Sequence, residues 1–107
     1  MTTDIKAKEI VEPILTRALV PFGLARLEVE GAFDHDGDPI IRATARYRPN
    51  APKLQPRVLL DAVVQAMNEL AKEGDSRFVH VRNVYAGGRA VTDDLAPPKK
   101  RRKAAAR

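Results

Sequence analysis

The sequence predicts an α+β fold, a two-layer sandwich in which two helices cover one face of a mostly antiparallel sheet, with the order α-β-β-α-β. Two segments carry apolar residues at helical spacing, and three segments alternate apolar and polar residues. Each alternating segment has one apolar side, as expected for strands that bury a single face. We expect one domain over residues 1–94 and a disordered basic tail over residues 95–107.

The first helix is expected from residue 4 to about residue 20. Its apolar residues recur three and four positions apart, and Pro21 and Gly23 follow as stop signals. Pro13 leaves two alternatives open. Either the helix kinks at this residue, or a stable helix begins with Pro13 in its first turn.

Two strands are expected over residues 24–33 and 40–48, and they form a hairpin around the sequence FDHDGDPI. Paired residues must lie on the same face of a sheet, which excludes the simplest two-residue turn. We therefore expect a loop centred on Gly37, with Phe33 paired to Ile41, or a shorter turn that carries a β-bulge.

A proline-rich loop precedes the second helix, which is expected over residues 56–73. Pro56 suits the first turn of this helix, and Gly74 is a typical C-terminal stop. A third strand is expected over residues 77–86. After a pair of glycines that can turn the chain, a short fourth strand is expected over residues 89–92.

The hairpin loop is a candidate cation site because Asp34, Asp36 and Asp38 alternate within it. This spacing resembles the start of a calcium-binding EF-hand loop. However, Pro39 stands where that loop requires glycine, and Ala45 stands where it requires a bidentate glutamate. Aspartate is also common in turns. We therefore favour a solvated acidic turn and expect no metal site.

No pattern typical of an enzyme is present in the sequence. The absence of cysteine removes disulfides, thiolate chemistry and zinc sites of the cysteine type. Neither His35 nor His80 is accompanied by a recognisable nucleophile and orienting group. The glycine pair before Arg89 lacks the longer pattern of a phosphate-binding loop. We expect a protein that is not an enzyme and needs no cofactor or small-molecule substrate.

Positive charge is concentrated at the C-terminal end. The formal net charge is +5, yet six basic residues lie in the last eleven positions, and the remainder has 13 basic residues against 14 acidic ones. A mobile polycation attracts phosphate backbones, and this attraction falls as salt rises. The candidate nucleic-acid-binding residues of the tail are Lys99, Lys100, Arg101, Arg102 and Lys103.

A second basic surface is expected on the outer face of the sheet. Alternation along the strands places there the further candidate nucleic-acid-binding residues Arg42, Arg46, Arg48 and Arg82. A solvated face, with Arg46 neutralised by Glu28, is the simpler interpretation of this pattern. Aromatic residues make up only 5% of the chain, which argues against a base-stacking surface.

Two resemblances follow from these segments. The hairpin DHDGDPII, together with RVLLDAVVQAMNELAKEGDSRFVHVR, resembles small uncharacterised bacterial proteins that have no established activity. The order of elements is similar to that of the N-terminal domain of bacterial ribosome maturation factors of the RimP type, and loosely to KH-like RNA-binding domains. The GXXG loop of KH domains is absent from this sequence.

Two functions fit these observations. The first is a non-enzymatic association module whose basic tail contacts nucleic acid or a ribonucleoprotein. The second is a protein-interaction subunit, antitoxin-like or adaptor-like, in which the tail only aids solubility. The sequence shows no signal peptide and no apolar run of membrane-spanning length. We therefore expect a cytoplasmic protein, or a nuclear one in a eukaryote, without a membrane partner.

Overall fold

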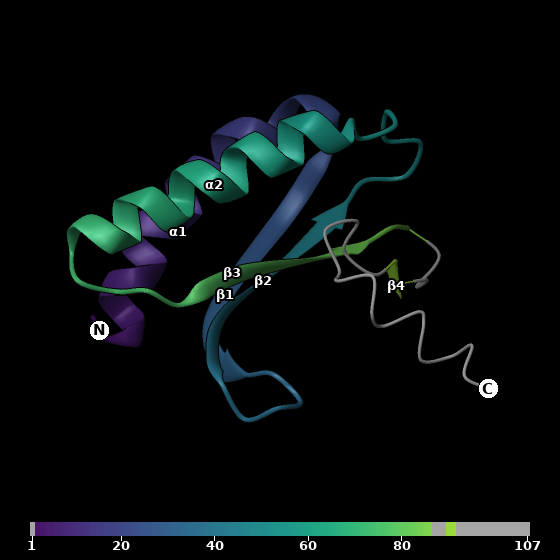
Figure 1. Ribbon diagram of the computed structural model, residues 1–107. Helices are drawn as coiled ribbons and strands as arrows, with labels where there is room; N and C mark the ends of the chain where they lie inside the picture. Colours follow the sequence, from purple (N-terminus) through teal and green to yellow (C-terminus); the bar gives the residue numbers. More distant parts are fainter. Residues whose placement is uncertain (1, 87–89, 92–107) are drawn as a thin grey trace.

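The computed structural model describes residues 2–86 and 90–91, which form an α+β fold (Figure 1). Its elements are α1 (Asp4–Leu19), the 3-10 helix η1 (Val20–Phe22), β1 (Leu24–Phe33), β2 (Pro39–Tyr47), α2 (Pro56–Lys72), β3 (Phe78–Val84) and β4 (Ala90–Val91). The predicted order of two helices and three longer strands is confirmed. The rest of the expected fourth strand and the basic tail lie outside the described residues.

The strands form a mixed sheet in the order β1-β2-β3-β4. The pair β1–β2 is antiparallel, whereas β2–β3 is parallel. The expectation of a mostly antiparallel sheet is therefore wrong at the centre. The physical reason is the connection between β2 and β3, because a helix such as α2 is long enough to return the chain to the end of the sheet where β2 began.

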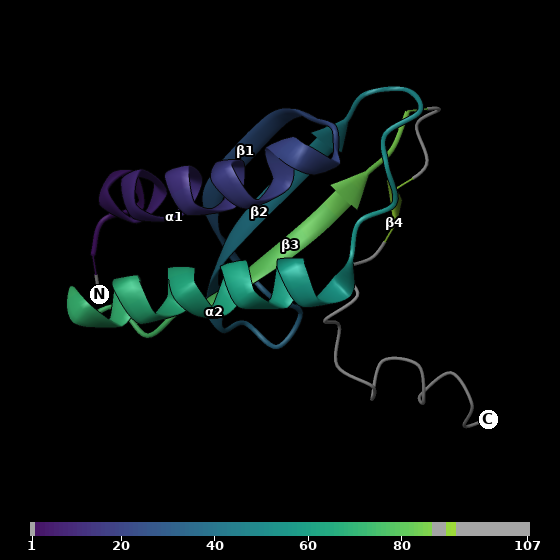
Figure 2. The same ribbon diagram turned by 90° about the horizontal axis from the view of Figure 1, so that it is seen from above.

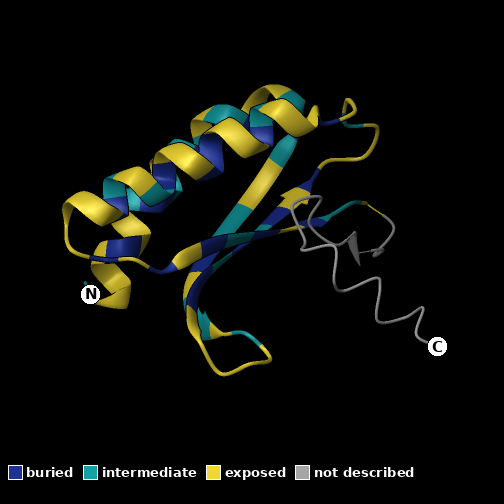
Figure 3. Cartoon of the chain, in the orientation of Figure 1, coloured by how far each residue is buried: buried dark blue, intermediate teal, exposed yellow. Residues whose placement is uncertain are grey.

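Both helices lie on one side of the sheet and run in opposite directions, with α1 towards β1 and α2 towards β3 (Figure 2). The positions coloured as buried lie on the sides of the helices and of the sheet that face each other (Figure 3). The core is almost entirely aliphatic, as the composition predicts. It contains Ala7, Val11, Leu15 and Leu19 of α1, Leu59, Ala62, Val63, Ala66 and Leu70 of α2, and Val29, Ile41, Ala43, Ala45, Val79 and Val81 of the strands.

Helix α1 continues through Pro13, so the stable helix does not begin at that residue. Its first turn is capped by Thr3, whose hydroxyl oxygen accepts a hydrogen bond from the backbone N–H of Lys6 at 3.1 Å. Proline cannot donate to the carbonyl of Glu9 one turn earlier. Both Pro13 and Glu9 are exposed, which leaves that carbonyl accessible to water and makes the proline tolerable.

In the described part of the chain, no helix is long and apolar enough to cross a lipid bilayer.

The hairpin has a different register from the one that the sequence favoured. Gly31 pairs with Ile41, and Phe33 pairs with Pro39, whereas we expected Phe33 opposite Ile41. The shift is two residues, so the side chains from Arg26 to Phe33 keep their predicted faces. The connecting loop spans residues 34–38 and is centred on Asp36, one residue before the expected centre at Gly37.

The apolar side of β1 is covered only in its central part. Val29 is buried, but Phe33 at the end of the strand is 68% exposed, and Ala25 near its start is also exposed. Alternation predicted all three on the helix side, but the register shift between Leu24 and Arg26 places Leu24 there in place of Ala25. Alternation fixes the side of the sheet on which a residue lies, but the extent of the helices decides whether that residue is covered.

A buried ion pair joins the turn after α2 to the beginning of the chain. Asp75 is 1% exposed and Arg77 is 7% exposed. The guanidinium group donates to the Asp75 carboxylate through Nε and Nη2, with an Nη2–Oδ2 distance of 2.7 Å. The Thr2 hydroxyl also donates to the same carboxylate, at 2.8 Å. The Asp75 carboxylate is therefore shared between Arg77 and Thr2.

The same guanidinium group reaches the first turn of α1. Its Nη1 donates to the Asp4 carboxylate at 2.8 Å, and its Nη2 donates to the Thr2 carbonyl at 3.0 Å. The hydrogen bonds from Arg77 hold the pKa of Asp75 well below its usual range, although burial alone would raise it. In turn, the hydrogen bond to the Asp75 carboxylate raises the pKa of Arg77. Both groups are therefore charged in the folded protein.

Gly31 of β1 lets the start of α1 approach the sheet. A Cβ atom at this position would lie 2.5 Å from the Asp4 carboxylate, which is the group that Arg77 holds. A side chain at position 31 would therefore displace the Asp4 carboxylate from the place where it accepts from Arg77.

We expect Asp75→Asn to lower the free energy of unfolding by about 3 kcal/mol, because the buried Arg77 would keep only the exposed Asp4 carboxylate as a charged partner. Urea denaturation measures this loss. Asp75 has a depressed pKa in the folded state, so its stabilisation is present above its ordinary pKa of 3.8 and is lost as the pH falls below that value. The melting temperature of the unmodified protein should therefore fall more steeply than that of the variant between about pH 4 and pH 2.

The matched control is Glu69→Gln, which breaks the exposed ion pair between Glu69 and Lys72 at 3.0 Å. We expect it to cost less than about 0.5 kcal/mol, because exposed pairs contribute little. Equal losses in the two variants would contradict the structural role of the buried pair.

A second prediction concerns Gly31→Ala, which we expect to cost about 1–2 kcal/mol because the new methyl group collides with the Asp4 carboxylate. In an Asp4→Ala background the same substitution should cost clearly less, since the obstructing carboxylate is gone. Equilibrium denaturation of the four proteins measures this coupling. Additive losses would show that Gly31 does not act through Asp4.

Candidate nucleic-acid interface

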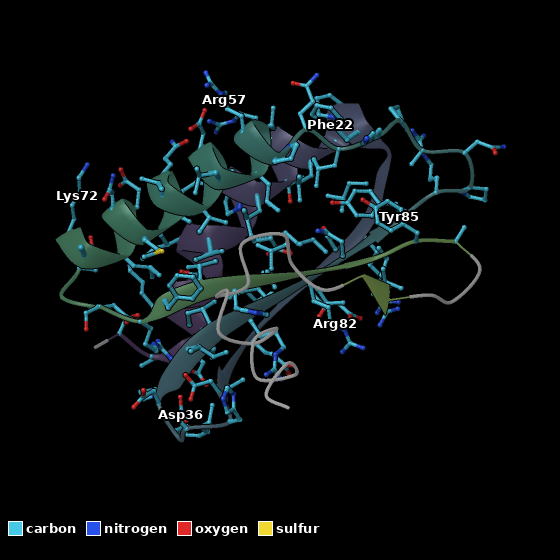
Figure 4. All side chains as sticks on the ribbon, turned by 45° about the vertical axis from the view of Figure 1, so that its right-hand side comes forward. Phe22, Asp36, Arg57, Lys72, Arg82 and Tyr85 are labelled. Atoms are coloured by element: carbon cyan, nitrogen blue, oxygen red, sulfur yellow. The ribbon has the colours of Figure 1, made fainter. Side chains whose placement is uncertain are left out.

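The outer face of the sheet is the side that the helices leave uncovered. The strand registers align its residues in four rows across β1, β2 and β3. The rows are Ala32–Ile40–Phe78, Glu30–Arg42–His80, Glu28–Thr44–Arg82 and Arg26–Arg46–Val84. Figure 4 shows Arg82 on this side of β3, whereas Tyr85 projects towards the helices. The structure therefore brings three of the sequence-predicted arginines, Arg42, Arg46 and Arg82, onto one surface.

One end of this surface is largely neutralised. Glu28 forms an ion pair with Arg46, with 3.6 Å between Nε and Oε1, and a second ion pair with Arg26, with 3.1 Å between Nη2 and Oε2. The contact between Arg46 and Glu28 was expected, whereas the contribution of Arg26 was not identified from the sequence. All three side chains are substantially exposed, so these pairs add little stability and compete weakly with an external anion.

Arg42 and Arg82 have a different environment. They lie on the adjacent central strands β2 and β3, one row apart. No carboxylate in the described part of the chain forms an ion pair with either residue. Arg82 is exposed and Arg42 is half-buried. These two cations are therefore the part of the outer face that is best able to meet phosphate groups.

The remaining predicted residues are not part of this pair. Arg48 is exposed just beyond the end of β2, where its backbone N–H donates to the Gly23 carbonyl at 2.9 Å. Lys99, Lys100, Arg101, Arg102 and Lys103 lie outside the described residues. Val91, the last described residue, pairs with Asn83 of β3.

An aromatic residue of the outer face was not identified as a site residue from the sequence. Phe78 is 42% exposed and pairs with Ile40 at the beginning of β3. The His80 ring lies beside it, with 6.4 Å between ring centroids and an angle of 53° between ring planes. The available signal was the alternation of Phe78, His80 and Arg82 along one strand, which places a ring in line with a cation.

The carboxyl ends of the parallel strands are closed by polar and aromatic contacts. The Tyr47 hydroxyl donates a hydrogen bond of 2.8 Å to the side-chain carbonyl oxygen of the buried Asn83. The Tyr85 ring stacks on Tyr47, with 4.8 Å between centroids and 13° between planes. Because the Asn83 carbonyl has a donor and the rings cover each other, this arrangement closes the core at that end of the sheet.

The acidic hairpin loop is organised by Asp34. Its Oδ1 accepts the backbone N–H groups of Asp36 and Asp38, each at 2.9 Å. The N–H of Gly37 donates to the Asp34 carbonyl at 2.9 Å, and Gly37 adopts a φ of 86° that favours glycine. One of the three aspartates is therefore committed to the turn itself. In residues 2–86 and 90–91, no cluster of three or more histidine and acidic side chains could hold a metal ion.

Comparison of the chain with protein-family models, curated proteins and solved structures gives no match. The similarities to small bacterial proteins and to ribosome maturation factors therefore stay predictions. The argument for function depends on the charge distribution of the chain and the geometry of its outer face.

We expect Asp34→Ala to lower the free energy of unfolding by about 1 kcal/mol, because two backbone N–H groups lose their acceptor. Asp36→Ala and Asp38→Ala are matched controls in the same loop, and each should change stability by less than about 0.5 kcal/mol. Thermal denaturation of the three variants measures the difference. Equal losses would show that the turn does not depend on the Asp34 carboxylate.

Proposed function

We propose that this protein is a non-enzymatic, two-layer α+β module that binds nucleic acid, alone or in a ribonucleoprotein. The observation that carries the proposal is the charge distribution, with six basic residues among the last eleven and a nearly neutral remainder. A cluster of this density attracts a phosphate backbone, because binding releases the counterions condensed on it. In this proposal Lys99, Lys100, Arg101, Arg102 and Lys103 make the principal contacts.

Arg42 and Arg82 provide the secondary contact. Two observations support this role: no described carboxylate forms an ion pair with either arginine, and Arg82 is exposed. The segment that leads to the basic cluster continues from β4, which pairs with the end of β3, the strand that bears Arg82. Contact by one basic surface raises the effective concentration of the other at the same nucleic acid.

A protein-interaction role, antitoxin-like or adaptor-like, is the second candidate. It is favoured by β1, which is an edge strand with β2 as its neighbour in the sheet. A groove of about 430 Å³ lies along this edge and is lined by residues of both faces, including Lys8 of α1, Leu27, Glu28 and Thr44. An extended segment of a partner could add to such an edge through backbone hydrogen bonds.

The test compares the full chain with a version that ends at residue 96, using fluorescence anisotropy at several salt concentrations. If all six basic residues of the tail, together with Arg42 and Arg82, contact phosphates, log Kd of the full chain against log salt should change with a slope of magnitude about 6–7. The truncated chain should bind weakly, with a slope of magnitude about 2 from Arg42 and Arg82.

The variant Arg82→Gln should reduce the salt slope of the full chain by about one, because it removes one phosphate contact. Arg17→Gln is the matched control, since Arg17 is an exposed arginine on α1, in the layer opposite the outer face. Equal and negligible binding by the full and truncated chains would overturn the nucleic-acid proposal and favour the protein-interaction role.

A further inference from the structure

We propose that the outer face holds a stacking site for an unpaired base, formed by Phe78, and that single-stranded nucleic acid is the ligand class of this protein. This inference rests on the proposed function and specifies its substrate. It also reverses the expectation, drawn from the low aromatic content, that base stacking has no place here.

The first argument is the position of the ring. Tyr47 and Tyr85 stack on each other, and Phe22 packs against the core, so these rings are engaged on the helix side. Phe78 instead lies on the outer face and is 42% exposed. Exposing a phenyl ring gives up the stabilisation that its burial would provide. A base stacked on the ring would remove this apolar surface from water.

The second argument is the group of side chains around the ring. His80, two residues further along β3, lies beside Phe78 and is the cross-strand partner of Arg42. Arg82 follows two residues after His80, at a spacing of about 7 Å per pair of residues in a strand. A planar ring and two arginines therefore lie within a few residues on the two central strands. This is the combination that binds a base through its face and the backbone through its phosphates.

The third argument concerns the choice between single and double strands. The face of a base is available for stacking on a side chain only when the base is unpaired. Proteins that read duplex DNA in the major groove commonly insert a helix. Both helices of this chain lie on the opposite side of the sheet (Figure 1). The outer face can therefore stack an unpaired base but presents no helix to a duplex groove.

The chain provides a direct reporter for this site because it contains no tryptophan. The variant Phe78→Trp introduces a single indole on the outer face. Phe33→Trp is the matched control, since Phe33 is 68% exposed but lies on β1, and alternation places it on the helix side of the sheet. A single-stranded oligouridylate of about twelve nucleotides, a length within the usual site sizes, is the probe.

We expect the oligouridylate to quench the indole fluorescence of Phe78→Trp at saturation and to leave that of Phe33→Trp nearly unchanged. A duplex of the same length should leave both unchanged, because its bases are stacked on each other. Equal quenching in both variants, or no quenching while the oligomer is bound, would overturn the stacking site.

The affinity experiment uses anisotropy on the otherwise unmodified full chain. Phe78→Leu, which keeps an apolar side chain in the strand, should weaken binding of the single strand about tenfold, whereas Phe78→Tyr should retain it. The salt slope should stay the same in both variants, because neither changes a charge. Phe33→Leu should bind as the unmodified protein does, and circular dichroism melting checks that all variants are folded.

The outcomes separate this inference from the proposed function. If Phe78→Leu binds as tightly as the unmodified protein while truncation at residue 96 abolishes binding, the stacking site is wrong and the nucleic-acid function stands. If single strands and duplexes bind equally well, the assigned ligand class is wrong. If no form of the chain binds either probe, both proposals fail.

Discussion

Small side chains at the centre of the sheet allow two helices to cover the same face. Ala43 and Ala45 of β2 are fully buried, and Ala66 of α2 and Ala7 of α1 are buried in the opposing layer. The four methyl groups leave room for the branched side chains around them, so an aliphatic core fills the space between the layers. The hydrophobic core cluster therefore lies on one side of the sheet, and most positions on the other side are free to serve binding.

The Asp75–Arg77 pair is the polar counterpart of that core. Two charges within a folded domain are costly unless each is matched, and here the carboxylate and the guanidinium group satisfy each other together with Thr2 and Asp4. The pair fastens the start of α1 to the turn before β3. It thereby helps to hold β3, the strand that carries Phe78 and Arg82, against the rest of the sheet.

One-sided burial also explains why the proposed interface combines unlike residues. Positions on the outer face contribute little to the core, so arginine, glutamate, histidine and phenylalanine occur there together. The glutamates are on β1, whereas the arginines that lack described acidic partners are on β2 and β3. This separation gives the outer face a neutralised side and a cationic side, and β4, the last described strand, pairs with β3 on the cationic side.

The sequence by itself determined the helices, the longer strands and the face on which Arg42, Arg46 and Arg82 lie, because period and alternation are local properties. Only the tertiary structure decided the parallel pairing of β2 and β3, the two-residue shift of the hairpin, the burial of Asp75 with Arg77, and the placement of Phe78 and Arg42 on adjacent strands. Hairpin registers that differ by two residues place each side chain on the same face, so alternation does not distinguish them. Contacts between residues far apart in the sequence produce no periodic pattern, and these contacts select the register that forms.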